Sequence, residues 1–313
     1  MLSSLRGAVV RDLFPAQSDQ WLTWLRVGLG IEVALYCLSL RADWTYLFAS
    51  NSKGLISPDL SEAVLLRDSA LTPRLRWFTV AGEYLGLSEE TTVLVLWTCL
   101  LCAGLLLTIG FCSRTSAIVA WVLHLCAVKS IGFMSYGADN FTTIGLFYLM
   151  VAPLPDRLTL DRRIRKMRTK DSSRHGFHRR VLQLHLCLVY FFGGLGKCLG
   201  KGWWDGSSMW RALIRPPFDV ISPETIASWG YLLPVAGVCV CLIEVGYSFL
   251  IWPRKTRMIW LILVLGMHIG IGLTMGLYLF SLIMIVLNAA AFAPDLVVGR
   301  ARQLLFLSRH ARV

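Results

Sequence analysis

Ionisable side chains stand inside segments of this sequence that are otherwise apolar, and they are the residues that can do chemistry. An unpaired charge at the centre of a bilayer costs at least about 3 kcal/mol, so such a residue is rarely kept without a use. Lys197 is the most prominent case, because it follows three glycines in the stretch YFFGGLGKC, residues 190–198. The others in apolar segments are Arg26, Glu32, His124, Lys129, Asp139, His185, Glu244 and His268.

Two interpretations of Lys197 follow from its position. A lysine near a helix end can extend its stem so that the ammonium reaches water, which costs little. Gly193, Gly194 and Gly196 favour the other interpretation, because they thin the helix and let another backbone approach. A lysine that lines a cavity made in this way can act as a base or hold an anion. Spacing alone leaves both interpretations open.

The elements that must position these residues are transmembrane helices. The chain has 313 residues, of which 56% are hydrophobic and 16% charged, and its mean hydropathy is +0.60. These values exclude an ordinary soluble domain. Repeated apolar windows favour helices over a β-barrel. We expect an all-α, polytopic transmembrane helical bundle with spans near 22–40, 92–111, 116–133, 139–154, 181–199, 232–251, 258–274 and 277–294.

The expected count is about eight helices, although seven are allowed if the last pair is wrongly divided at Thr274-Met275-Gly276. This division predicts three parts: a cytoplasmic N-terminal segment (1–20), a transmembrane domain (21–296) and a basic cytoplasmic tail (297–313). Within the domain we expect a basic cytoplasmic loop at 155–180. The outer loops, 41–91 and 200–231, should form a cap of loops or short helices. The first contains a possible amphipathic helix at Pro58–Leu66.

Charge distribution supports this topology. Of the 31 Lys and Arg residues, 20 fall in segments predicted to be inside and eight in those predicted outside, as the positive-inside rule requires. We therefore predict a multi-pass protein of the cell membrane or another internal membrane, with both termini cytoplasmic. The expected partner is the lipid bilayer rather than nucleic acid, because the net charge of +12 is explained by topology.

Span directions predict which charges meet. Lys129, Asp139, Lys197 and Asp205 should form one cluster near the outer side, with Lys129 and Asp139 as a structural ion pair. Arg26 and Glu244 should form a second, structural intramembrane pair, because a spacing of six positions puts Arg26 and Glu32 on different helix faces. No metal site is expected, because the histidines lack partners at helical spacing.

The segment VYFFGGLGKCLGKGWWDGSSM, residues 189–209, resembles the membrane domain shared by vitamin K-dependent γ-glutamyl carboxylases and the HTTM (horizontally transferred transmembrane) proteins. Its pattern is Tyr-Phe, small residues, Lys, a short spacer, then Trp and an acidic-Gly pair. The resemblance extends over roughly residues 20–296. Also matching are Arg26 to Gly30, Gly137-x-Asp139, Glu244, His268 and Ala293-Pro294.

The resemblance implies that Lys197 is the base that deprotonates a vitamin K-like hydroquinone, with Tyr190, Trp204 and His268 as binding or supporting residues. A quinone is therefore the candidate cofactor. Two departures argue against full γ-carboxylation by this chain alone. The sequence has no room for a large lumenal domain, and it has Tyr136-Gly137-Ala138-Asp139-Asn140 where the carboxylases carry a histidine.

Two functional hypotheses remain. In the first, an outer-facing polar cavity around Lys197 handles a quinone- or lipid-like ligand in a carboxylase-related manner. In the second, the protein is a non-enzymatic membrane component that supports export, maturation or toxin production by a separately encoded partner protein. Small-solute transport is a third class, but the sequence shows no clear inverted repeats. The sequence does not decide whether the protein is an enzyme.

Overall fold

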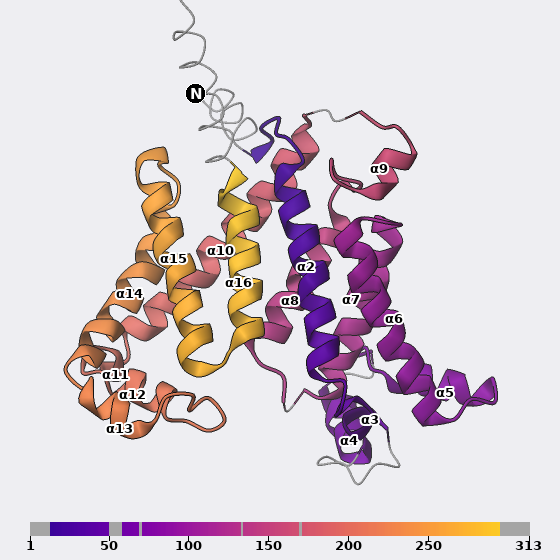
Figure 1. Ribbon diagram of the computed structural model, residues 1–313, viewed down its shortest axis with the longest axis horizontal. Helices are drawn as coiled ribbons and strands as arrows, with labels where there is room; N and C mark the ends of the chain where they lie inside the picture. The colour runs from indigo at the N-terminus through magenta and orange to yellow at the C-terminus, as the bar shows by residue number, and fades with distance from the viewer. Residues whose placement is uncertain (1–12, 50–57, 69–70, 133, 169–170, 295–313) are drawn as a thin grey trace, which may run out of the picture. The chain divides into compact units, whose positions relative to one another are not determined.

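The computed structural model describes residues 13–49, 58–68, 71–132, 134–168 and 171–294 (Figure 1). Most of the predicted N-terminal segment (residues 1–12) and the predicted basic tail lie outside the described residues. The described chain consists of helices and connecting loops, and its one β-type pairing is an isolated bridge between Gln17 and Ser172. The all-α prediction is confirmed.

Each of the eight predicted spans coincides with a helix. Five of these helices are long and apolar enough to cross a membrane: α2 (Gln20–Ser39), α6 (Glu89–Ile109), α10 (Ser173–Cys198), α14 (Leu232–Leu250) and α15 (Arg254–Met275). α16 (Tyr278–Phe292) is apolar but shorter. The remaining two are α7 (Ser113–Ser130), which begins with the polar run Ser-Arg-Thr-Ser, and α8 (Gly137–Val151), with 15 residues.

Local sequence signals set the ends of these helices. The Ser88 hydroxyl caps α6 by accepting from the Thr91 backbone N–H, and Glu89 and Glu90 complement the helix dipole in its first turn. Gly276 has a φ of 68°, in the left-handed region that glycine adopts without strain, and it ends α15. The predicted turn at Thr274-Met275-Gly276 therefore separates two helices, so the last predicted pair is correctly divided.

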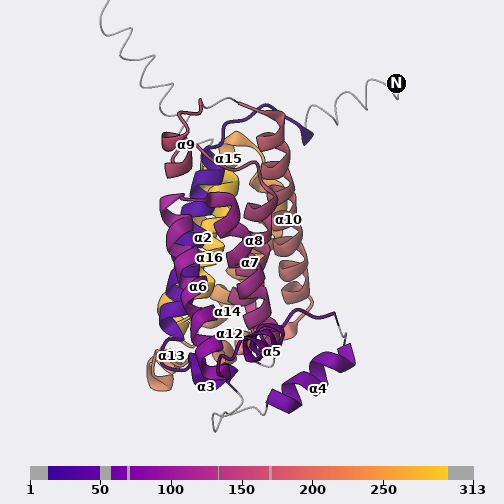
Figure 2. The ribbon, with the colours of Figure 1, turned by 90° about the vertical axis from the view of Figure 1, so that its right-hand side faces the viewer.

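The chain divides into two compact units. We call residues 25–169 the N-terminal unit, and residues 170–313 together with 1–24 the C-terminal unit. In the N-terminal unit, α6 packs on α7 and α7 packs on α8 (Figure 2). α2 lies very close to α6, because Gly30 and Gly104 face each other and a Cβ on Gly30 would stand 2.7 Å from the Gly104 carbonyl oxygen.

Three short helices follow α2 in the predicted outer loop: α3 (Trp44–Phe48), α4 (Pro58–Asp68) and α5 (Arg76–Tyr84). The predicted helix at Pro58–Leu66 is confirmed as α4. Trp44 anchors α3, since its indole N–H donates to the Val93 carbonyl oxygen of α6 at 2.9 Å. Between α8 and α10 lies the short α9 (Leu160–Ile164).

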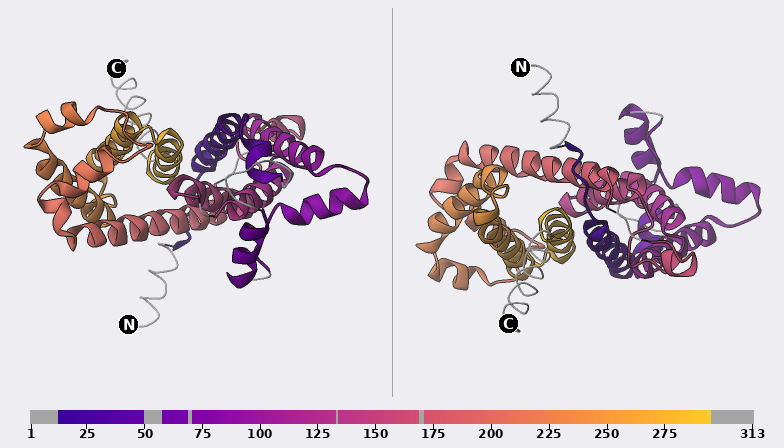
Figure 3. Two further views of the ribbon diagram at one scale, coloured as in Figure 1. Left: turned by 90° about the horizontal axis from the view of Figure 1, so that it is seen from below. Right: turned by 90° about the horizontal axis from the view of Figure 1, so that it is seen from above.

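In the C-terminal unit, α10 packs along α14 and also against α16, and α15 packs against both α14 and α16. In Figure 3, α16 (yellow) is seen nearly end-on, whereas α10 (pink) runs lengthwise across the view. The predicted outer loop 200–231 contains α11 (Lys201–Trp204), α12 (Ser207–Leu213) and α13 (Pro223–Ser228). Leu213, Ile226 and Leu233 form a small buried cluster beneath them, so this loop is a folded cap on the end of α14, as predicted.

Candidate functional site

Lys197 forms an ion pair with Glu244. The lysine stands in the last turn of α10, and its Nζ lies 2.6 Å from Oε2 of Glu244 on α14. The side chains are 25% and 11% exposed, so the pair is sheltered without being sealed from its surroundings. This arrangement corrects the predicted Arg26–Glu244 pair, because the carboxylate of Glu244 is taken by a lysine of its own unit.

Glycines allow this pair to form. A Cβ on Gly194 would stand 2.8 Å from the Val245 backbone nitrogen and 2.9 Å from Cβ of Glu244, so α10 and α14 could not approach as closely with any other residue there. A Cβ on Gly193 would lie 3.5 Å from Glu244 Oε2 and 3.8 Å from Lys197 Nζ, in ordinary contact with both charged groups. The prediction that these glycines admit another backbone is confirmed for Gly194.

An aromatic ring covers one side of the lysine. The Nζ of Lys197 lies 5.4 Å from the centroid of Trp203, within the range of a cation–π interaction. The backbone of Trp203 lies directly against α14 at Gly237. A larger residue at 237 would not fit, because its Cβ would stand 2.2 Å from the Trp203 carbonyl oxygen. The neighbouring Trp204, which the sequence motif singled out, is 50% exposed and donates its indole N–H to the Cys198 carbonyl oxygen. The orientation of α11 decides which of the two adjacent tryptophans faces Lys197. The sequence motif does not specify that orientation.

A buried chain of hydrogen bonds lies deeper in the same unit. The Tyr247 hydroxyl donates to Asn288 Oδ1 at 2.7 Å, and Asn288 Nδ2 donates to the Tyr190 hydroxyl at 2.8 Å. The Tyr190 oxygen stands 2.7 Å from Nε2 of His268. Tyr190 and His268, both predicted as supporting residues, are thus brought together. Asn288 and Tyr247 were missed, although a lone asparagine in the apolar run LIMIVLNAAAF was a usable signal.

The direction of the hydrogen bond between Tyr190 and His268 depends on the tautomer of His268. Asn288 Nδ2 donates to the Tyr190 oxygen, and in one arrangement the Tyr190 hydroxyl proton points at His268 Nε2. The histidine proton then lies on Nδ1, and this atom is buried with no hydrogen-bond partner among the described residues. Electrostatic interactions also connect the network to the ion pair, because Glu244 acts on Tyr190 and Lys197 acts on His268.

Asp205, predicted as a neighbour of Lys197, has another role. It is exposed and accepts a hydrogen bond from the Ser207 backbone N–H at 2.9 Å, at the start of α12. Hydrogen bonds from Ser207, followed by the charges of Lys201 and Arg211, hold the pKa of Asp205 below its usual range. The prediction was wrong because this aspartate is satisfied locally, by the backbone N–H of the first residue of α12 and by the charges of Lys201 and Arg211.

Lys129 and Asp139 belong to the N-terminal unit, and no ion pair joins them among its described residues. Lys129 is exposed in the last turn of α7. Asp139 is buried and accepts from the Tyr136 backbone N–H at 2.9 Å, so that it caps its own helix, α8. Their predicted pairing is therefore wrong, for the same reason as with Asp205.

Arg26 forms the other intramembrane ion pair, and its partner is Asp156. Their side chains are 1% and 0% exposed, and Arg26 Nε lies 2.5 Å from Asp156 Oδ2. The guanidinium also donates to the Leu107 and Thr108 carbonyl oxygens at the end of α6. Asp156 follows a predicted span, and the sequence did not indicate that this loop folds back into the unit. This pair replaces the predicted contact between Arg26 and Glu244.

A second polar cluster surrounds Glu32 in the N-terminal unit. Glu32 is 1% exposed, and its Oε1 accepts from the Thr142 hydroxyl at 3.4 Å. His124 on α7 stacks near Tyr36, with ring centroids 4.9 Å apart, and its Nδ1 contacts the Thr143 hydroxyl at 2.9 Å. Groups of three or more His, Cys, Asp or Glu side chains able to hold a metal ion do not occur among the described residues.

Together, the apolar helices and the sheltered lysine–carboxylate pair define a polytopic helical membrane protein with a polar centre in its C-terminal unit. The family model of the HTTM domain matches residues 77–295, which include both members of that pair and the whole hydrogen-bonded network. The chain therefore belongs to the HTTM domain family, as the resemblance predicted. No curated protein and no solved structure matches the chain.

Proposed function

We propose that the C-terminal unit binds a quinone- or lipid-like ligand beside Lys197, and that Lys197 serves there as a general base or as an anchor for an anionic oxygen. The observation that supports this most directly is the Lys197–Glu244 pair, which is partly exposed at 25% and 11%. The attraction between two opposite charges is strongest where water is excluded, as it is at the fully buried Arg26–Asp156 pair. The Lys197–Glu244 pair keeps one side open.

Glu244 gives Lys197 a way to act as a base. The ammonium donates to Oε2 of Glu244, so the proton can move along this 2.6 Å contact to the carboxylate. The lysine is then a neutral amine with a lone pair, which a general base requires. While the proton remains on Nζ, the same group attracts an anionic oxygen.

The surroundings of the pair fit a flat ring with an apolar tail. Trp203 offers an aromatic face beside Lys197, and a Cβ on Gly196 would meet nothing within 4 Å. Phe192, Leu195 and Leu199 are exposed along the same part of α10 and suit an apolar chain. His268 Nδ1 is buried and has no hydrogen-bond partner among the described residues, and we propose it as a further contact for a ligand oxygen. A hydroquinone held here would supply a weakly acidic phenolic hydroxyl and a reducing ring.

The test measures what remains bound to the purified full-length protein. The wild type in mild detergent is extracted with organic solvent, and quinones and lipids are quantified by mass spectrometry per mole of protein. We expect a stoichiometric compound in the wild type, lost in K197M and in G193V, which fills the space next to both charged groups. K129M is the matched control, because it removes an exposed lysine from the equivalent end of another helix.

Two results would overturn this proposal. If K197M retains as much ligand as the wild type, Lys197 is not part of the binding site. The same conclusion follows if both proteins bind vitamin K hydroquinone with equal affinity. Either result would favour the alternative function, in which the protein supports export, maturation or toxin production by a separately encoded partner protein.

We also propose that both termini are cytoplasmic, in the cell membrane or another internal membrane, with Lys197 toward the outer side. The excess of Lys and Arg in the predicted inner loops supports this orientation. Membrane-impermeant maleimide should label a cysteine introduced at Ser208 in intact cells or sealed vesicles, and should not label one introduced at Ser173. The reverse pattern contradicts the orientation.

A further inference from the structure

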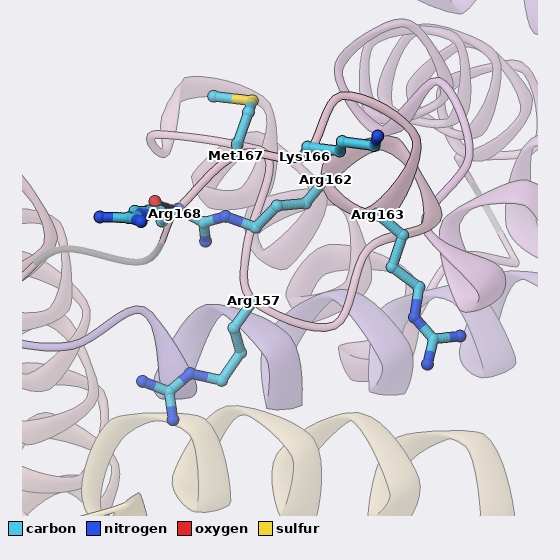
Figure 4. A pocket seen from close by; sticks show the side chains of 6 residues that line it. All are labelled: Arg157, Arg162, Arg163, Lys166, Met167 and Arg168. Carbon is cyan, nitrogen blue, oxygen red and sulfur yellow. Dashed lines mark hydrogen bonds between the residues drawn. The ribbon is translucent and has the colours of Figure 1, made fainter.

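The loop that contains α9 forms a basic hollow of about 560 Å³, which we call the α9 hollow. Figure 4 shows its lining, with Arg162 extending toward Arg168 and Arg163 pointing to the other side of the loop. Five of the six lining side chains are cationic: Arg157, Arg162, Arg163, Lys166 and Arg168, with Met167 as the sixth. All lie within the N-terminal unit, whereas Lys197 belongs to the C-terminal unit.

Asp156 and Asp161, the acidic residues next to the lining of the hollow, make short contacts with other parts of the unit. Asp156 is fully buried against Arg26. Asp161 accepts hydrogen bonds at 2.7 Å from the Cys112 and Ser113 backbone N–H groups and from the Ser113 hydroxyl. Both carboxylates are thereby engaged with the α6–α7 end of the unit, whereas Arg157, Arg163 and Lys166 remain exposed.

The loop is held in this shape by several contacts. The Thr159 hydroxyl caps α9 by accepting from the Arg162 backbone N–H, and Arg162 Nη2 donates to the Arg168 carbonyl oxygen at 2.7 Å. The Asp161 backbone N–H donates to the Gly110 carbonyl oxygen at 3.1 Å. Five like charges are thus kept around one space by contacts that do not need an anion. An anion placed there would relieve their mutual repulsion.

Apolar side chains on the same loop identify the kind of anion. Leu158 is 67% exposed and Ile164 is 62% exposed, next to the cationic lining, and Met167 is 47% exposed. Exposed leucine and isoleucine beside a cluster of arginines are typical of a segment at the surface of a bilayer, where apolar groups enter the acyl region and cations meet phosphates. A free phosphate would use the charges but not these apolar groups.

We propose that the α9 hollow binds the phosphate headgroup of an anionic phospholipid. The arginines and Lys166 contact the phosphate, and Leu158, Ile164 and Met167 contact the acyl chains near the headgroup. The loop thus becomes a lipid-binding element of the N-terminal unit, separate from the ligand proposed for Lys197.

Native mass spectrometry of the full-length protein in detergent, titrated with dioleoyl phosphatidylglycerol, tests this proposal. The variant R163Q/K166Q/R168Q removes three exposed charges of the hollow, and R174Q/R254Q/K255Q removes three exposed charges elsewhere. Each basic residue near an anionic headgroup contributes about 1 kcal/mol, so we expect on the order of 100-fold weaker binding in the first variant and little change in the second. Equal losses in both would mean that net charge alone attracts the lipid, and would overturn the proposal.

A second arm separates a lipid from free phosphate. The variant I164S/M167S should weaken phosphatidylglycerol binding several-fold while leaving the affinity for soluble glycerophosphate unchanged. If inorganic phosphate at millimolar concentration displaces the lipid completely, or if I164S/M167S binds the lipid as tightly as the wild type does, the hollow is a simple anion site. Phosphatidylcholine, which carries no net charge, should not bind the hollow in any variant.

Discussion

Among the described residues, an ion pair joins Arg26 to Asp156 in the N-terminal unit and Lys197 to Glu244 in the C-terminal unit, and the two pairs differ in how completely they are buried. In the N-terminal unit, Arg26 and Asp156 are 1% and 0% exposed, and the guanidinium also bonds two carbonyl oxygens of α6. In the C-terminal unit, Lys197 and Glu244 are 25% and 11% exposed, and the ammonium faces an aromatic ring and glycine-lined space.

This difference separates a structural pair from a chemical one. A guanidinium that donates to a carboxylate and two carbonyl oxygens has little capacity left for a ligand, and it does not give up its proton. A lysine with one carboxylate partner keeps spare donors and can exchange a proton. Removing the first pair should therefore damage the fold, while removing the second should damage binding.

The largest expected effect is that of R26M. Removing one partner of a fully buried pair leaves an uncompensated charge and typically costs about 3–5 kcal/mol. Thermal unfolding in detergent should show a large drop for R26M, and the double variant R26M/D156L should recover part of it. If R26M melts no lower than K197M, the contrast between the two pairs is lost.

The next effect concerns the approach of α10 to α14. G194A should destabilise by about 1–3 kcal/mol, because a new methyl group is forced against the backbone of α14. G196A is the matched control on the same helix, and nothing lies within 4 Å of its added Cβ. It should be neutral or gain up to about 1 kcal/mol from helix propensity. Equal melting temperatures for the two variants contradict the close packing that positions Lys197.

A smaller stability effect is expected for the second ion pair. Because Lys197 is partly exposed, its interaction with Glu244 should contribute about 1 kcal/mol or less to the folded state. A double-mutant cycle with K197M and E244Q, followed by thermal unfolding, measures the coupling. A coupling as large as that between Arg26 and Asp156 would mean that both pairs are structural.

The smallest effect is the pH dependence of the loop that supports Arg26. Partial burial opposes the charged form of Asp161, but hydrogen bonds from Ser113 and Cys112 outweigh it and lower its pKa. The pKa is lower in the folded than in the unfolded state, so this contribution is present above about pH 4 and is lost as the pH falls through the folded pKa. D161N should therefore lower the melting temperature slightly at pH 7, and the difference from wild type should shrink below pH 4. A constant difference at all pH values excludes this linkage.

The helices could be predicted from the sequence because hydropathy and helix capping depend on residues that are close together in the chain. Each of the eight predicted apolar spans coincides with a helix, and Gly276 marks the division between α15 and α16. The family resemblance also rested on a local motif, and it selected Lys197, Tyr190 and His268, of which the last two share a hydrogen bond.

The partners of the charged residues were less accessible. Asp139 and Asp205 were assigned to an ion-pair cluster, yet each one accepts a hydrogen bond from a backbone N–H at a nearby helix start. Asp156 was placed in a cytoplasmic loop, yet it is fully buried against Arg26. An aspartate can be satisfied by a neighbouring backbone N–H or by a distant cation, and residue type and spacing do not distinguish these.

The amino-acid sequence by itself determined that this protein is a helical membrane protein of the HTTM type with a glycine-flanked lysine at a helix end, because hydrophobicity, turn residues and a short motif act over a few residues. Only the tertiary structure decided that Glu244 is the carboxylate beside Lys197 and that Trp203 covers it. Those contacts depend on how closely α10 and α14 approach at Gly194, and such a distance is set by packing between segments far apart in the chain.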